Sequence, residues 1–190
     1  MRGIIFQAFS DFIENTFDYE TLDSLYMDSS YPNKGGFSVA GSYEPAYLVS
    51  MAEYCVGFFD NSLEKVYYSF GKFAFPYLIN KYKKNYDGMY TPIVASNAFS
   101  FLRSLNILHH DELKKIYPDA KFPKFDIDVV SNKHLIIDYS SPLDLPYLVH
   151  GLIDGCLETY RCDAKVTMTT LKETKNIDSK VCKIYRFEVK

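Results

Sequence analysis

The sequence predicts an α+β fold, with a mostly helical N-terminal half packed on a C-terminal half that contains helices and a four-stranded antiparallel sheet. Apolar residues in the first half recur at steps of three and four, which is typical of amphipathic helices. From Phe125 onward the period changes to two, which is typical of strands. Two hairpins on either side of one helix favour an antiparallel sheet with helices on one side.

The first half is predicted to be almost entirely helical. Three helices are expected over residues 4–17, 18–27 and 44–58. A loop rich in Ser, Gly, Pro and Asn separates the second from the third, over residues 28–42. A fourth helix begins at Asn61 or Ser62, whose side chain can accept a hydrogen bond from the first turn. It either breaks near Pro76 or continues past it with a kink.

The second half begins with one long predicted helix over residues 94–116, which ends before Pro118 because proline lacks the N–H that a further turn needs. A hairpin follows, with strands at residues 125–129 and 134–139 joined by Asn132 and Lys133. A helix over residues 143–159 comes next. The last two strands, residues 164–171 and 180–189, are expected to meet across a polar turn at residues 173–176.

Composition limits the classes of function. A chain of 190 residues suits a single domain, and 47% hydrophobic residues are enough for a substantial core. The net charge of −3 argues against nucleic-acid binding, which usually needs a basic patch. No apolar stretch is long enough to span a bilayer, and the four cysteines form no CxxC pair, so we expect a cytoplasmic protein with reduced thiols. No nucleophile–histidine spacing or phosphate-binding glycine loop indicates an enzyme.

Two adjacent histidines lie near the end of the long helix. His109 belongs to the apolar stripe of this helix, with Leu102, Leu105, Leu113 and Ile116, and His110 lies beside that stripe. A single helical histidine is more often a structural group than a metal ligand, so spacing alone leaves both readings open.

The segment that follows carries a resemblance to a known family. The run from His110 to Pro118 is similar to H-D-x-L-x-x-I-Y-P, and Pro123, Tyr139 and Ser141 follow at matching separations. This pattern resembles the proximal-histidine region and Y-x-S-x-R motif of the H-NOX family, the haem-nitric oxide/oxygen binding domains that include the sensor domain of soluble guanylate cyclase. The similarity runs nearly from end to end. One position departs from the motif, because Leu143 stands where the arginine belongs.

The resemblance implies a haem b buried between a helical subdomain at residues 1–65 and a ligand-bearing sheet subdomain at residues 66–190. The family register selects His110 as the iron ligand, with His109 as the alternative. Tyr139 and Ser141 would hold a propionate, and Ile5 and Pro123 would press on the porphyrin. Because Leu143 has no guanidinium group to bind the propionate, we expect weaker haem binding or a shifted propionate. Of the cysteines, only Cys182 matches a ligand position of the zinc site found in some members, so no zinc is expected.

The distal side of the haem would set the choice of gas. In oxygen-binding members a tyrosine, a tryptophan and an asparagine supply hydrogen bonds, and the matching residues here are Leu148, Phe9 and Ala74, none of which donates. The resemblance therefore implies a sensor of nitric oxide and carbon monoxide that excludes dioxygen. Release of His110 would signal to a partner, a histidine kinase or a cyclic-di-GMP enzyme. The alternative is a haem-free H-NOX-like interaction module.

Overall fold

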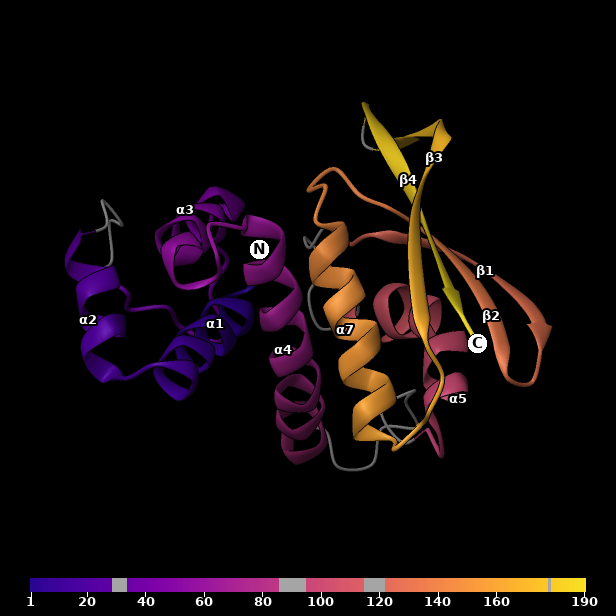
Figure 1. The fold of residues 1–190 in the computed structure, drawn as a ribbon, viewed down its shortest axis with the longest axis horizontal. Coiled ribbons are helices and arrows are strands. Elements are labelled where there is room, and N and C mark those ends of the chain that lie inside the picture. Colours follow the sequence, from indigo (N-terminus) through magenta and orange to yellow (C-terminus); the bar gives the residue numbers. More distant parts are fainter. Residues whose placement is uncertain (29–33, 86–94, 115–121, 178) are drawn as a thin grey trace.

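The computed structural model of the chain describes residues 1–28, 34–85, 95–114, 122–177 and 179–190. Helices form one end of the molecule and the sheet forms the other, with α4 (Leu63–Asn85) and α7 (Pro146–Thr159) side by side between them (Figure 1). This arrangement confirms the predicted α+β fold. Pro118 lies outside the described residues, as does part of the loop predicted over residues 28–42.

The helical end contains the predicted helices. They are α1 (Gly3–Thr16), α2 (Tyr19–Asp28), α3 (Pro45–Cys55), which continues into a short 3-10 helix, η1 (Val56–Phe58), and α4. Ser62 caps α4, because its Oγ accepts a hydrogen bond of 3.3 Å from the Lys65 N–H. Of the two outcomes predicted at Pro76, the continuous helix is the one observed, since α4 runs through this residue.

The single helix predicted over residues 94–116 is wrong. Within the described residues the chain forms α5 (Ala98–Arg103) and then the π-helix η3 (Ile107–Leu113), separated near Ser104. The Ser104 hydroxyl donates a hydrogen bond of 2.7 Å to the Phe101 carbonyl, so a side chain competes with the regular helical pattern at this point.

Four antiparallel strands form one sheet in the order β1-β2-β4-β3, which confirms the predicted sheet. The strands are β1 (Lys124–Ser131), β2 (His134–Ser140), β3 (Val166–Ile177) and β4 (Lys180–Val189). The polar turn predicted at residues 173–176 is wrong, because Thr174 to Ile177 pair with β4. A register shift between Thr170 and Thr174 lets β3 continue.

The helix α7 begins at Pro146, three residues later than predicted. The Leu143 N–H donates to the Ser141 hydroxyl at 3.2 Å, and Asp144 has a φ of 28°. A positive φ is incompatible with a helical turn, so the chain turns at these residues before α7 starts.

Two hydrophobic clusters meet across α4 and α7. The helical cluster is built on α1, α3 and the first half of α4, and the sheet cluster on α5, η3, α7 and the inner face of the sheet. Leu152 packs against both. Gly71 and Gly151 let the two helix backbones approach closely, since a Cβ at either would collide with the opposite backbone. The subdomain boundary at residue 65 stays a prediction, because α4 contributes to both clusters.

Two further observations concern the described ranges only. None of their helices is both long and apolar enough to cross a membrane. Nor do they bring together three His, Cys, Asp or Glu side chains in a group suited to a metal ion.

Candidate functional site

The two histidines of η3 lie in different environments. His110 is exposed, whereas the His109 ring packs against Phe122 and Phe125 with centroid separations of 5.6 and 5.4 Å. His109 Nδ1 lies 2.8 Å from the Leu105 carbonyl oxygen, to which a protonated Nδ1 donates. Burial lowers the pKa of His109 to about 4, so the ring is neutral near pH 7. The structure thus packs the partly buried His109 ring against the sheet cluster and leaves His110 at the surface.

The segment that carries both histidines is a π-helix. A π turn closes with an i→i+5 hydrogen bond and therefore contains one more residue than an α turn. His109 packs against Phe122 and Phe125 and His110 is exposed, in agreement with the apolar stripe predicted from the sequence. The assignment of His110 as ligand stays a prediction. Short π segments occur frequently at functional sites.

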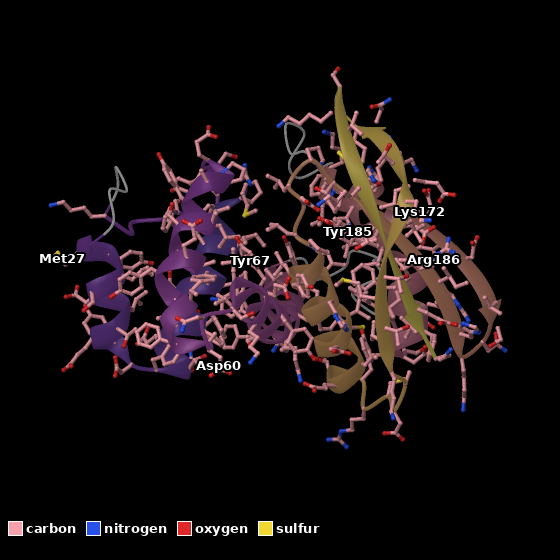
Figure 2. All side chains as sticks on the ribbon, turned by 45° about the horizontal axis from the view of Figure 1, so that its top comes forward. Met27, Asp60, Tyr67, Lys172, Tyr185 and Arg186 are labelled. Carbon is pink, nitrogen blue, oxygen red and sulfur yellow. The ribbon has the colours of Figure 1, made fainter. Side chains whose placement is uncertain are left out.

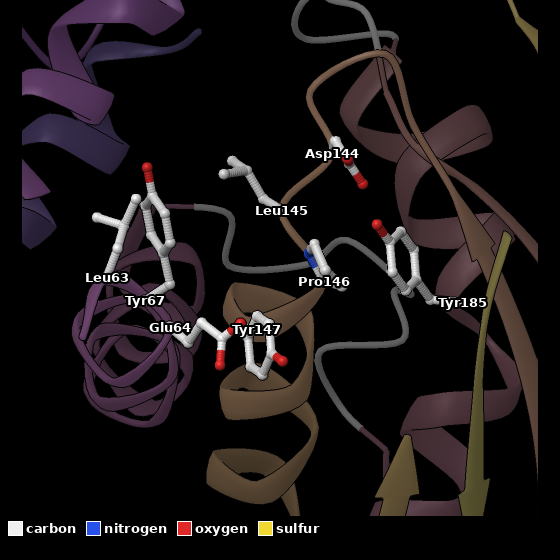
Figure 3. A pocket seen from close by; sticks show the side chains of 8 residues that line it. All are labelled: Leu63, Glu64, Tyr67, Asp144, Leu145, Pro146, Tyr147 and Tyr185. Carbon is white, nitrogen blue, oxygen red and sulfur yellow. The ribbon is translucent and has the colours of Figure 1, made fainter. Parts of the chain in front are cut away.

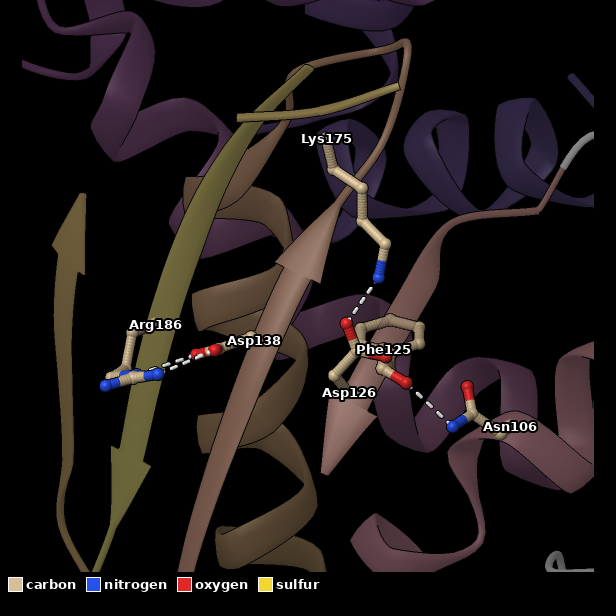
Figure 4. A network of polar contacts seen from close by, with 6 residues as sticks. All are labelled: Asn106, Phe125, Asp126, Asp138, Lys175 and Arg186. Atoms are coloured by element: carbon tan, nitrogen blue, oxygen red, sulfur yellow. Dashed lines mark hydrogen bonds and ion pairs between the residues drawn. The ribbon is translucent and has the colours of Figure 1, made fainter. Parts of the chain in front are cut away.

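Side-chain hydrogen bonds attach this helical region to the sheet. Asn106 Nδ2 donates to the Phe125 carbonyl at 2.7 Å, and an Arg103 guanidinium nitrogen donates to the Ser131 carbonyl at 3.1 Å. Figure 4 shows the Asn106 amide directed at β1. Any displacement of η3 would therefore be transmitted to the first strand.

The structure brings the predicted distal residues into one cluster. Phe9 is fully buried and Ala74 nearly so, and Ile5 and Leu148 are partly buried against the same helical cluster. The Phe9 ring meets the Phe70 ring edge-on, with centroids 4.8 Å apart. None of the three predicted distal side chains, Phe9, Ala74 and Leu148, can donate a hydrogen bond, and neither can Ile5, the predicted porphyrin contact beside them. They come from α1, α4 and α7, which converge on this cluster.

The predicted propionate clamp lies at the end of β2. Tyr139 and Ser141 are both buried, and the Tyr139 hydroxyl hydrogen-bonds with Ser141 and with the Leu145 backbone. Burial raises the pKa of Tyr139, so its phenol stays protonated and able to donate. Leu143, in the turn beyond Ser141, is 38% exposed. Pro123, the other predicted haem contact in this half, is half-buried just before β1.

A cavity of about 230 Å³ adjoins the clamp. It lies between the first turns of α4 and the start of α7, as the close view in Figure 3 shows, and its lining residues are Leu63, Glu64, Tyr67, Asp144, Leu145, Pro146, Tyr147 and Tyr185. In Figure 2, Tyr67 belongs to the helical side and Tyr185 to the sheet side of the molecule. This cavity is smaller than a typical cofactor pocket, so it accommodates an edge of a cofactor only.

Tyrosine–carboxylate pairs line this cavity. Burial is the main cause of the raised pKa of Tyr185, which also hydrogen-bonds to Asp144. A hydrogen bond to Glu64 raises the pKa of Tyr147. Sequence reasoning missed Asp144 and Tyr185, because only the register of β4 on β2 reveals that Tyr185 lies opposite Tyr139.

The donor chemistry fits a haem. A haem needs an axial ligand, hydrogen-bond donors for its propionates and an apolar sleeve. The adjacent histidines of η3 offer an imidazole, Tyr139 and Ser141 offer two buried hydroxyls, and the helical cluster offers apolar walls.

Comparison with known proteins agrees with this donor set. The family model described as haem-NO-binding matches residues 2–168. No curated protein matches the chain. Among solved structures, the Fe(II) unliganded H-NOX protein from K. algicida is 22% identical, with a TM-score of 0.78 over 99% of this chain and 96% of that one.

Two Shewanella structures are similar to this chain over nearly their whole length. The S. oneidensis H-NOX in the Fe(II)NO state is 19% identical, with a TM-score of 0.77 over 100% of this chain and 99% of that one. The IWP-051-bound H-NOX from Shewanella woodyi, in the Fe(II)CO state, is 27% identical, with a TM-score of 0.73 over 98% of this chain and 93% of that one. The chain therefore belongs to the H-NOX family, whose members bind haem and sense diatomic gases.

Proposed function

We propose that this protein is a haem-based sensor that binds nitric oxide and carbon monoxide and excludes dioxygen. The observation that carries the proposal is the absence of a hydrogen-bond donor from all three predicted distal side chains, Phe9, Ala74 and Leu148, which lie in or against the helical cluster. Bound dioxygen gains from such a donor, whereas nitric oxide and carbon monoxide need one far less. The hydroxyl nearest to Leu148 in the sequence, that of Tyr147, is bonded to Glu64.

In this proposal His110 is the iron ligand, as the family spacing indicates, and it coordinates as neutral imidazole. Because His110 is exposed on the π-helix, its ligation requires η3 to present it inward, and His109 is the competing ligand. When bound, haem b supplies the iron at which the gas binds. Tyr139 and Ser141 hold a propionate through their hydroxyls, and Ile5 and Pro123 press on the porphyrin.

The contacts of η3 support a route for the signal. Loss of the bond from His110 would free η3 to change its conformation, and Asn106 and Arg103 would pass the displacement to β1. Such a change is a population shift between two conformations and needs no catalysis. H-NOX domains signal to partner proteins, and the partner we propose is a histidine kinase or a cyclic-di-GMP enzyme in the cytoplasm.

The test is the absorption spectrum of the haem-loaded, dithionite-reduced protein in air-free buffer, with each gas added separately. The proposal predicts a Soret band that shifts with nitric oxide and with carbon monoxide but stays unchanged with dioxygen. A stable dioxygen complex of the unmodified protein would contradict it.

A matched pair of variants sharpens the test of gas choice. Leu148→Tyr adds a ring and a hydroxyl to the distal cluster, and Leu148→Phe adds the ring alone. Only Leu148→Tyr should gain a dioxygen complex, because only that variant supplies a donor. Equal dioxygen binding by the two variants would show that hydrogen bonding is not the discriminating factor.

A haem-free interaction module is the second candidate. Leu143 in place of an arginine and the small size of the described cavity favour it. Failure to retain haem after reconstitution would support this module and contradict the sensor.

A further inference from the structure

The clamp of this protein lacks a cation at its expected position. A haem propionate is a carboxylate, and a charged donor binds it more strongly than a hydroxyl does. Tyr139 and Ser141 supply hydroxyls only, and the Leu143 backbone N–H donates to Ser141. A positive charge for this end of the site has to come from another element.

The strand β4 brings an ammonium group next to the clamp. Lys183 Nζ lies 3.6 Å from Asp144 Oδ2, and Asp144 directly follows Leu143. Two residues further along β4, the Tyr185 ring lies 6.3 Å from the Tyr139 ring, opposite which it pairs in the sheet. Figure 3 shows the Asp144 carboxylate and the Tyr185 hydroxyl directed at one another on the cavity wall. Lys183 is therefore paired with a carboxylate that lines the cavity adjoining the clamp.

The pairing of Lys183 with Asp144 is easily exchanged. Their side chains are 62% and 51% exposed, and ion pairs this accessible to water are weak. A lysine ammonium on its flexible four-carbon chain can move to a second carboxylate nearby. A cofactor carboxylate entering at Tyr139 and Ser141 would be such a second partner.

Two other cations of the sheet form ion pairs away from the clamp. Arg186 forms a bidentate ion pair with Asp138, in which its Nε and Nη2 donate to the two carboxylate oxygens at 2.8 and 2.7 Å. Lys175 Nζ lies 2.5 Å from Asp126 Oδ2. Figure 4 shows both pairs: Arg186 on β4 binds Asp138 on the neighbouring β2, and Lys175 on β3 binds Asp126 on β1. Lys183 differs from these two because its partner lies in the turn that bears the clamp.

We propose that Lys183 supplies the positive charge for a haem propionate in place of an arginine at position 143. Lys183 acts as a positioning residue, because it contacts a carboxylate at the edge of the cofactor and not the iron or the gas. The inference rests on the proposed haem binding.

The experiment compares haem loss from the unmodified protein, Lys183→Met and Lys183→Arg to an excess of a haem-scavenging globin. Lys183→Met should lose haem about fivefold faster, the equivalent of one exposed ion pair, and Lys183→Arg should match the unmodified protein. Lys65→Met is the matched control, since it removes an exposed lysine that pairs with Asp60 at 2.7 Å in the helical half. This control should leave the rate of haem loss unchanged.

Two additional measurements separate charge pairing from a general structural effect. Iron protoporphyrin IX dimethyl ester carries no propionate charge, so the difference between Lys183→Met and the unmodified protein should vanish with this cofactor. In a Leu143→Arg background, Lys183→Met should have little effect, because the arginine already supplies the charge. Urea unfolding of the haem-free proteins should not distinguish Lys183→Met from the unmodified chain.

The outcomes keep the two proposals apart. An unmodified protein that takes up no haem would overturn the proposed function. Haem loss from Lys183→Met at the unmodified rate, or an equal acceleration with the dimethyl ester, would overturn only the role of Lys183.

Discussion

Gly151→Ala tests the close approach of α4 and α7, on which the contact between the two halves depends. The added Cβ would overlap the Tyr68 carbonyl oxygen and lie 2.9 Å from the Tyr68 carbonyl carbon and 3.0 Å from Gly71 Cα. All three are backbone atoms, so no side chain can move aside. The helices would have to separate by roughly 1 Å to restore ordinary carbon contacts.

The expected destabilisation follows from two opposing effects. Overpacking a well-packed interface costs about 1–3 kcal/mol, and a site bounded by backbone lies at or above the upper end of that range. Alanine recovers up to about 1 kcal/mol through its better helix propensity. We therefore expect Gly151→Ala to lower the free energy of unfolding by about 2 kcal/mol, which moves the urea midpoint down by roughly 1 M.

Urea unfolding followed by circular dichroism measures this change. Gly57→Ala is the matched control, because no atom lies within 4 Å of its added Cβ, and it should stay within about 0.5 kcal/mol of the unmodified protein. If Gly151→Ala proved as stable as the unmodified chain, the two helices would not pack as closely as described.

Three further predictions concern buried groups. Burial raises the pKa of Cys55 to about 12, so iodoacetamide at pH 8 should modify this thiol only when the protein unfolds. The half-buried Cys162 should be modified well before Cys55, and equal labelling of the two by mass spectrometry would contradict this. The pKa of His109 is about 4 in the folded protein, below its ordinary 6.5, so the unfolded chain binds the extra proton first as the pH falls. The free energy of unfolding of the haem-free protein should therefore decrease by about 2 kcal/mol between pH 7.5 and 5, and that of His109→Leu should decrease less. Identical decreases in urea titrations of the two proteins would refute this. Tyr68→Phe removes a hydrogen bond of 2.6 Å to Asp154 and should cost about 1–2 kcal/mol in the same assay; an unchanged midpoint would argue against that bond.

Local sequence signals were enough for the helical end. Phe9, Phe12 and Ile13 lie at helical spacing and are buried as expected, because α1 needs only one apolar face. The capping role of Ser62 could also be predicted, since the acceptor and the donor it satisfies are three residues apart. Such features depend on neighbours in the sequence.

One error occurred where distant residues decide the structure. The polar segment from Glu173 to Asn176 has the composition of a turn, yet it is a strand because β4 is available to pair with it. Tertiary pairing overrides local preference there. The break of the predicted long helix near Ser104 is different, because it accompanies a local hydrogen bond from the Ser104 hydroxyl to the Phe101 carbonyl, which the apolar periodicity does not reveal.

Some residues of the candidate site could be predicted from the sequence, and others are revealed only by the tertiary structure. The family resemblance supplied Tyr139, Ser141 and the distal residues, and the structure locates each of them among buried groups or beside them. The place of Lys183 beside the clamp depends on how β4 lies against β2 and on the turn at Asp144. No periodicity in the sequence carries that information.

Imidazole rescue of the axial ligand, with both histidines compared, decides whether His110 binds the iron. His110→Gly and His109→Gly are loaded with haem, reduced, and followed by absorption spectroscopy before and after free imidazole is added. Only His110→Gly should lose the five-coordinate ferrous spectrum, and imidazole should restore it together with the nitric oxide response. An intact spectrum in His110→Gly, with loss and rescue in His109→Gly, would contradict this assignment and give the iron to the histidine whose ring packs against Phe122 and Phe125.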